Sequence, residues 1–208
     1  MRRFLSSQKF AAALFIGLIV TGISMQYVHT VQADIAKSLV RLHIIANSDG
    51  EDDQALKLKV RDGVIEYLSD KVGTAQTPEE TKAILRGELK NIAECAQSEL
   101  LKNGYGYSVT VQLGNFDFPT KHYEGAALPA GSYDALRIII GSGEGKNWWC
   151  VLFPQLCFTS EGSGGFSEES RQKLKNMLTD DEYNIVTESD SGDIPVKIKF
   201  RILEIFGR

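Results

Sequence analysis

Hydrophobic and polar residues follow two different periods along the chain after its first segment. Apolar residues occupy every second position over 40–46, which predicts a strand. Farther on, apolar residues recur at steps of four and seven, which predicts a helix over 51–71 with one broad apolar face. Ser48 and Glu51 have the spacing of a capping box, in which a hydroxyl and a carboxylate satisfy free N–H groups at a helix start. We therefore expect the helix to begin there.

A second helix and a sheet are predicted by the next stretch. Thr77 and Pro78 give another start signal, because proline suits the first helical turn, where no N–H is needed. Apolar residues at helical spacing continue to about Asn103, where the helix should end. The period then changes to two over 109–113 and again over 136–140, so we expect these segments to be paired strands.

The remaining segments complete the predicted architecture. Residues 114–134 contain several glycines and prolines and predict a loop, with a short strand over 121–124. A helix is predicted over 167–178 and a final strand over 196–202. We therefore predict a single α+β domain over 34–208. Its antiparallel or mixed sheet of about four to five strands should pack with two long N-terminal helices and a further C-terminal helix.

The start of the chain has the composition of an export signal, which we assign to residues 1–33. A short cationic stretch is followed by residues 10–33, which carry no formal charge and end in a small-x-small tripeptide of the kind that signal peptidase cleaves. One alternative is an uncleaved anchor over 10–28, because a spanning helix needs about 20 apolar residues. Another is the buried helix of a cytosolic protein. Both export interpretations place the chain from Asp34 onward outside the cytoplasmic membrane.

The uneven charge of the chain limits the partners that it suits. The whole chain has a formal net charge of −4, but residues 1–33 contain three basic residues and no acid, so the remainder carries −7. Binding to nucleic acid depends on lysine and arginine displacing counterions from phosphates, and an acidic body disfavours it. We expect no nucleic-acid partner, and contact with a membrane only through the N-terminal segment.

Familiar catalytic and cofactor motifs are missing from the sequence. The glycine-rich stretch 141–145 follows a predicted strand, but Ile140 and Asn147 break the Walker pattern and the third glycine of a dinucleotide loop is missing, so a flexible turn is expected. The Gly-x-Ser-x-Gly motif is absent. A nucleophile-base pair of Cys150 with His122 would depend on the fold. We therefore expect no enzymatic activity and no cofactor.

The most unusual segment is 148–158, eleven residues without a charge that include two tryptophans and two phenylalanines. Such side chains bury large areas, so one interpretation is hydrophobic core. The other is an aromatic anchor for a protein partner, because large aromatic residues are enriched at interface hot spots. Pro154 opposes a regular helix or a central strand through the middle, so we expect part of the segment to be a shaped loop.

The three cysteines raise the questions of a disulfide and a metal site. Cys150 and Cys157 enclose six residues, and outside the cytoplasm a disulfide between them is the default expectation. Zinc sites usually place cysteines about two to four residues apart and add a second ligand pair, whereas the histidines of this chain are scattered. We expect no metal site. Cys95 lies on a predicted helix and is expected to be a small buried hydrophobe.

Several segments of the sequence resemble a known family. They are Arg-Leu-His-Ile-Ile-Ala-Asn-Ser-Asp at 41–49, Asp-Gln-Ala-Leu-Lys-Leu-Lys-Val-Arg-Asp at 53–62, Leu-Pro-Ala-Gly at 128–131 with Ala-Leu-Arg at 135–137, and Asn-Trp-Trp-Cys-Val-Leu-Phe-Pro at 147–154 with Leu-Cys at 156–157. Together they resemble the stage II sporulation protein R family of endospore-forming bacteria, over about 40–158. The family usually has a second proline where this chain has Gln155.

This resemblance implies an intercompartmental signal and not an enzyme. It implies a protein that is made in the forespore and secreted into the space between the forespore and mother-cell membranes. It also implies a partner, a membrane-embedded aspartic peptidase, which the signal activates and which then removes the pro-sequence of sigma-E.

Our hypothesis for the partner-binding site joins this resemblance to the uncharged aromatic segment. The site would use six residues of that segment and three polar residues beside it: Trp148, Trp149, Phe153, Pro154, Leu156 and Phe158, with Arg41, Asn47 and Asp49. One alternative is a secreted cysteine-dependent hydrolase of the cell envelope with Cys150 as nucleophile. Another is a purely structural envelope protein.

Overall fold

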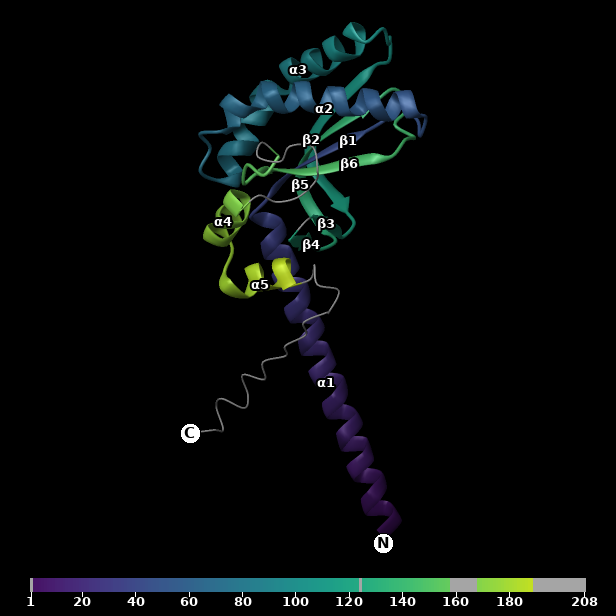
Figure 1. Cartoon of the computed structure of the whole chain (residues 1–208). Coiled ribbons are helices and arrows are strands. Elements are labelled where there is room, and N and C mark those ends of the chain that lie inside the picture. Colours follow the sequence, from purple (N-terminus) through teal and green to yellow (C-terminus); the bar gives the residue numbers. More distant parts are fainter. Residues whose placement is uncertain (1, 124, 158–167, 189–208) are drawn as a thin grey trace.

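The structure, a computed structural model, describes residues 2–123, 125–157 and 168–188 (Figure 1). In chain order the elements are α1 (Arg2–Lys37), β1 (Val40–Ile45), α2 (Glu51–Val72), α3 (Pro78–Lys102), β2 (Val109–Phe118), β3 (Lys121–Tyr123), β4 (Ala126–Leu128), β5 (Gly131–Ile140), β6 (Asn147–Phe153), α4 (Glu168–Met177) and α5 (Asp180–Glu188). This order confirms the α+β class. The strand predicted over 196–202 lies outside the described residues.

Within the described residues the main sheet has four strands, in the order β2-β5-β1-β6. β1 runs parallel to β5 and antiparallel to β6, and β2 runs antiparallel to β5, so the sheet is mixed. The predicted pairing of 109–113 with 136–140 is confirmed, with Val109 opposite Ile140. β3 and β4 form a separate two-stranded hairpin.

The helices differ from the prediction in number and arrangement. The two predicted long helices are α2 and α3, but α1, with 36 residues, precedes them as another long helix. The helix predicted over 167–178 is α4, and α5, which was not predicted, follows it. A capping box that the prediction missed lies at the start of α5. The Thr179 N–H donates to the Glu182 carboxylate at 2.7 Å, and the Glu182 N–H donates to Thr179 Oγ1 at 3.4 Å.

The predicted start of α3 is confirmed in detail. The Glu80 N–H donates to Thr77 Oγ1 at 3.1 Å, and the Glu80 carboxylate accepts from the Gln76 N–H at 2.7 Å. Pro78 occupies the first turn, as expected. These contacts satisfy donors that a helix leaves unpaired at its N-terminus.

The capping box predicted at the start of α2 is wrong. The N-cap is Gly50, and no side chain caps the helix. Ser48 Oγ instead donates to Asp53 Oδ2 at 2.6 Å and accepts from the Gly50 N–H at 3.1 Å. The Ser48 hydroxyl therefore stabilises the loop before α2, because it bonds the buried Asp53 and not the exposed Glu51.

One face of the main sheet is covered by α2 and α3 (Figure 1). Alternate residues of the central strands point into this layer, and they are fully buried together with apolar residues of both helices: Leu42, Ile44, Leu136, Ile138, Val60, Val64, Leu85 and Ile92. Burial of apolar surface stabilises a fold by about 25 cal/mol per Å². This layer is therefore the main source of stability.

The opposite face of the sheet is covered only in part. A second apolar cluster packs on one half of it and joins the last turns of α1 to the hairpin, α4 and α5: Ile35, Leu39, Phe118, Leu128, Tyr133, Val151, Leu174 and Val186. Over the other half, the side chains of the described residues are exposed or half-buried, except His43, which is 7% exposed. The two faces thus differ in cover although they belong to the same strands.

Most of α1 projects away from the body of the molecule (Figure 1). Its segment Lys9–Lys37 is long and apolar enough to cross a membrane, with a mean hydropathy of 1.8 over an 18-residue window. The helix continues without a break through Ala33, where the predicted signal would end, and Ile35 is fully buried against the body. This helix is compatible with a signal peptide or with an anchor.

Candidate partner-binding face

The half of the second sheet face that the described residues leave uncovered consists of two rows of residues that run across the main sheet. Because neighbouring strands are paired in register, each row takes one residue from each strand, in the order β2, β5, β1, β6. The two rows, which we call the open face, are Gln112, Arg137, His43 and Trp149, and next to them Thr110, Ile139, Ile45 and Asn147. The following row, which lies under the second apolar cluster, is Gly114, Ala135, Arg41 and Val151.

An aromatic stack lies at the centre of the open face. The rings of His43 and Trp149 are nearly parallel, at 16°, with centroids 3.8 Å apart. Phe118 closes one side of the stack, with its ring centroid 4.6 Å from that of Trp149. His43 Nε2 lies 2.8 Å from Asn147 Oδ1, and because a carbonyl oxygen only accepts, the ring N–H donates. These contacts hold the half-buried indole of Trp149 in one orientation.

Two cations flank the aromatic stack. The guanidinium of Arg137 lies 4.0 Å from the centroid of the Phe116 ring, and its Nη2 donates to Gln112 Oε1 at 2.6 Å. Lys121 Nζ, from the hairpin, lies 5.4 Å from the centroid of the Trp149 ring. Cations over aromatic faces are attracted by the ring quadrupole, so both charges are held at defined places.

His43 is kept neutral at the centre of this group. Burial lowers its pKa from 6.5 to about 4, and the hydrogen bond to Asn147 opposes that shift. The positive charges of Arg137, Arg41 and Lys121 lower the pKa further. At neutral pH the imidazole therefore acts as a flat, uncharged ring, and Arg137 and Lys121 supply the charge of the exposed surface.

Arg41 adds positive charge from beneath the hairpin. Its side chain is fully buried, with the guanidinium 4.2 Å from the Phe118 ring centroid and 4.8 Å from that of Tyr133. Nη2 donates to Tyr123 Oη at 2.8 Å, whereas Nε and Nη1 have no hydrogen-bond partner among the residues that the structure describes. Arginine stays protonated even when buried. The structure places Arg41 in the interior, and not among surface contacts.

The adjacent tryptophans of the hypothesised site lie on opposite faces of the sheet. Successive side chains of a strand point to opposite sides, so Trp149 belongs to the open face while Trp148 packs against the main core. The guanidinium of Arg61, on α2, lies 5.1 Å from the Trp148 ring centroid. Of these two residues, Trp149 is therefore the one that a partner on the open face would meet.

The rest of the hypothesised aromatic site is mostly buried. Phe153 is 4% exposed, Leu156 is 1% exposed, and Pro154 is also buried. Phe158 lies outside the described residues. β6 ends at Phe153, and the chain then turns, which agrees with the shaped loop expected around Pro154. The core interpretation thus holds for Phe153, Pro154 and Leu156, and a partner anchor at Trp149 stays a prediction.

Cys150 and Cys157 form a disulfide in the structure, with Cα atoms 5.8 Å apart. The bridge holds the turn 154–157 against the outer edge of β6, where the Cys157 N–H donates to the Val151 carbonyl at 3.1 Å. Gln155 donates from Nε2 to the Val72 carbonyl at 2.9 Å and ties the turn to the end of α2. Part of the edge of the sheet is therefore covered by the chain itself.

Asn47 and Asp49 hold two loops together. Asn47 Oδ1 accepts from the Ser142 N–H at 3.0 Å, and Asp49 Oδ1 accepts from the Lys146 N–H at 2.7 Å. Both contacts join the loop after β1 to the glycine-rich turn. Gly145 is needed there because a Cβ would lie 2.2 Å from the Ser48 carbonyl oxygen. The structure thus uses these polar residues for internal contacts.

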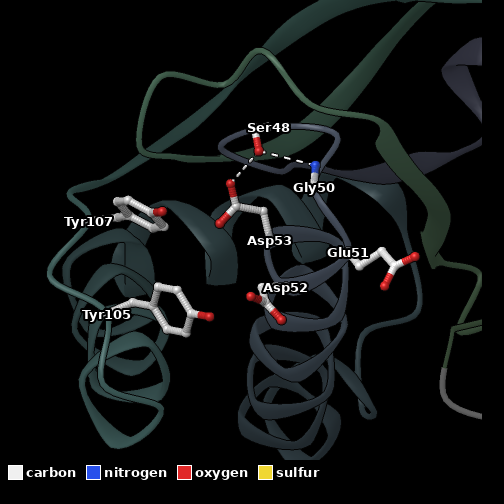
Figure 2. Close-up of a pocket in the computed structure, with 7 residues that line it drawn as sticks. All are labelled: Ser48, Gly50, Glu51, Asp52, Asp53, Tyr105 and Tyr107. Carbon is white, nitrogen blue, oxygen red and sulfur yellow. Dashed lines mark hydrogen bonds between the residues drawn. The ribbon is translucent and has the colours of Figure 1, made fainter.

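A shallow acidic pocket of about 490 Å³ lies at the start of α2 (Figure 2). It is lined by Ser48, Gly50, Glu51, Asp52, Asp53, Tyr105 and Tyr107. Hydrogen bonds from Ser48 and Asn47 hold the pKa of Asp53 below its ordinary value, and Figure 2 shows this carboxylate turned toward Ser48. Among the described residues, no group of three or more His, Cys, Asp or Glu is arranged to hold a metal. The hydrogen bonds to Asp53 stabilise the loop and the start of α2.

The sequence hypothesis missed most of the open face. It omitted Gln112, Arg137 and the isoleucines, and the single histidine of β1 had the features of a structural residue. One signal was available, because Arg137 breaks an otherwise apolar run in β5. That signal becomes specific only when the register places this arginine beside His43.

Comparison with known proteins assigns the chain to a family. The model of the family described as stage II sporulation protein R matches residues 36–163. The chain belongs to this family. A stage II sporulation protein R of Bacillus subtilis (strain 168) is 39% identical over 180 residues, which cover 82% of this chain and 80% of that protein. No solved structure matches.

The family match covers the part of the chain that builds the open face. Residues 36–163 include every strand of the main sheet and both helices that cover its other side. α4, α5 and most of α1 lie outside the match. Membership of this family supports a role in sporulation signalling.

Proposed function

We propose that this chain is an exported intercompartmental signal of sporulation that binds and activates a membrane-embedded aspartic peptidase. The peptidase would then activate pro-sigma-E by proteolysis. α1 would carry the body across the forespore membrane, into the space between that membrane and the mother-cell membrane, either as a cleaved signal peptide or as an anchor. The body would work as a ligand and not as an enzyme.

The open face is the observation that carries the proposal. It presents a half-buried tryptophan and Arg137 on the main sheet, with Lys121 of the neighbouring hairpin beside them, inside the segment that the family model matches. Residues with these properties are enriched at protein interfaces, and sites on regular elements hold their geometry better than loops do. Activation also sets a requirement. A shift of the peptidase from about 1:99 to 99:1 in favour of its active form needs roughly 5.5 kcal/mol of preferential binding.

The chemistry of the cysteines favours a binding role over the hydrolase alternative. A cysteine nucleophile acts as a thiolate, and Cys150 is bonded to Cys157. Cys95 is half-buried, its Sγ donates to the Gly63 carbonyl at 3.4 Å, and burial raises the pKa of its thiol. A raised pKa lowers the thiolate fraction, so neither sulfur is prepared for attack.

Reconstitution in a non-sporulating host tests the proposal. The full chain, the peptidase and pro-sigma-E are expressed together, and mature sigma-E is measured by immunoblot. We expect maturation only when all three are present, and none when the catalytic aspartate of the peptidase is replaced. Maturation without this chain, or none when the chain is exported and folded, would refute the proposed function.

A further inference from the structure

We infer that the open face binds an acidic segment of its protein partner, with a carboxylate opposite Arg137. This inference rests on the proposed function, because it specifies the chemistry of the surface that the peptidase would present.

The charge of the open face is opposite to that of the body. From residue 34 onward the chain carries a net −7, yet none of the eight residues of the open face is acidic. Arg137 and Lys121 lie at its surface, and Arg41 lies beneath the hairpin next to it. The charges that lower the pKa of His43 are all positive. A local positive field on an acidic protein favours a negative partner, whereas the net charge of −7 on each body opposes association of two copies.

The guanidinium of Arg137 is arranged to receive a carboxylate. Nε and Nη2 donate to Gln112 Oε1 at 3.2 and 2.6 Å, and the planar group lies over the Phe116 ring. Among the described residues Nη1 has no hydrogen-bond partner, so its donors face no competitor within that part of the molecule. Because the side chain is already ordered, a carboxylate would pair with it at a low entropic cost.

The remaining residues of the open face suit a protein segment. Ile45 and Ile139 form half-buried apolar positions next to the aromatic stack, and Trp149 offers an indole face. Such a mixture of aromatic, aliphatic and arginine contacts is typical of the centre of a protein interface. Proteins usually bind an anionic membrane surface through about four to eight clustered lysines or arginines. Among the described residues, this face and the hairpin beside it offer only Arg137 and Lys121 at the surface.

The experiment measures the affinity of the full chain for the full-length peptidase, both in detergent, and compares charge reversal on two sides of the sheet. Arg137→Glu changes the open face. Arg86→Glu makes the same change of charge on the exposed side of α3, in the layer across the sheet. We expect Arg137→Glu to weaken binding about tenfold or more and Arg86→Glu to weaken it less than about twofold. Arg137→Lys, which keeps the charge but loses the planar group over Phe116, should weaken binding less than Arg137→Glu does.

Salt gives a second readout. The affinity of the unchanged chain should fall as NaCl is raised from about 50 to 300 mM, and Arg137→Glu should remove most of this dependence. Thermal unfolding of each variant shows whether the fold is kept. If Arg137→Glu unfolds, the affinity of Arg137→Lys relative to the unchanged chain still measures the contribution of the guanidinium.

Three results would overturn the inference. Equal loss for Arg137→Glu and Arg86→Glu would mean that only the total charge matters. Unchanged binding by Arg137→Glu while Trp149→Ala abolishes it would mean a face without charge recognition. Binding of the unchanged chain to vesicles of anionic lipid, lost in Arg137→Glu, with no binding to the peptidase, would mean a membrane surface. In the first two cases reconstituted maturation of sigma-E would still depend on the unchanged chain, so the proposed function would stand.

Discussion

The two faces of the main sheet are built from the same strands and have opposite characters. On the side of α2 and α3, Leu42, Ile44 and Leu136 are completely buried among apolar neighbours. On the open face, Arg137 and Trp149 stay accessible in the neighbouring positions of the same strands. Because successive side chains of a strand alternate between faces, a single strand supplies stability to one side and recognition to the other. The comparison implies that substitutions one residue apart should have different consequences.

The largest expected effect comes from the covered face. Leu136→Ala should lower the free energy of unfolding by about 2–5 kcal/mol, because it leaves a cavity in a fully buried layer. Gln112→Ala on the open face should cost less than about 0.5 kcal/mol, as exposed substitutions usually do. Chemical denaturation followed by circular dichroism measures both. Equal costs would show that the open face is as tightly packed as the covered one.

The next effect concerns the disulfide that holds the end of β6 against the covered face. Loss of a bridge that closes so short a loop should cost about 2–3 kcal/mol. Cys150→Ser and Cys157→Ser should therefore lower stability and sigma-E maturation to the same extent, and the double variant should be no worse than either. Loss of all maturation in Cys150→Ser alone, with Cys157→Ser only weakened, would favour a nucleophile at Cys150.

The adjacent tryptophans sharpen the comparison most directly. Trp148→Ala should lower the free energy of unfolding by about 2 kcal/mol, since its half-buried ring packs on the main core. It should leave maturation per folded molecule unchanged. Trp149→Ala should instead reduce maturation per folded molecule about tenfold or more. Immunoblots of the exported chain and of mature sigma-E give the ratio, and identical behaviour of the two variants would remove the distinction between the faces.

Much of the covered face could be predicted from the sequence. Its helices show strong amphipathic spacing, and α3 has a complete start signal at Thr77 and Glu80, so both long helices follow from local patterns. β2 and β5 alternate clearly and were expected to pair. Local patterns were enough because burial on one side imposes a regular period.

The rest could not be predicted because it depends on contacts between distant segments. β6 is uncharged throughout, and its apolar run conceals the alternation that separates Trp148 from Trp149. Asn47 and Asp49 resemble exposed polar contacts in the sequence, but the glycine-rich turn folds back onto them. The open face itself exists only through the register that aligns Arg137, His43 and Trp149.

The smallest expected effect is a dependence of stability on pH that originates in the open face. The pKa of His43 is about 4 in the folded chain and about 6.5 as an unperturbed imidazole, so the unfolded state binds more protons between these values. The contribution of this group to stability is complete above pH of about 6.5 and is lost as pH falls toward about 4. His43 is itself buried, but Arg137 and Trp149 beside it are partly exposed and water can reach the protonated ring after a small local movement, so we expect a loss of less than about 2 kcal/mol. Denaturation of the unchanged chain and of His43→Gln at several pH values isolates it, since the acidic groups common to both cancel in the difference. The difference in the free energy of unfolding between the two chains should be constant above pH of about 6.5 and should change below it. A difference that stays constant down to pH of about 4 would mean that His43 binds its proton equally well in the folded and unfolded states.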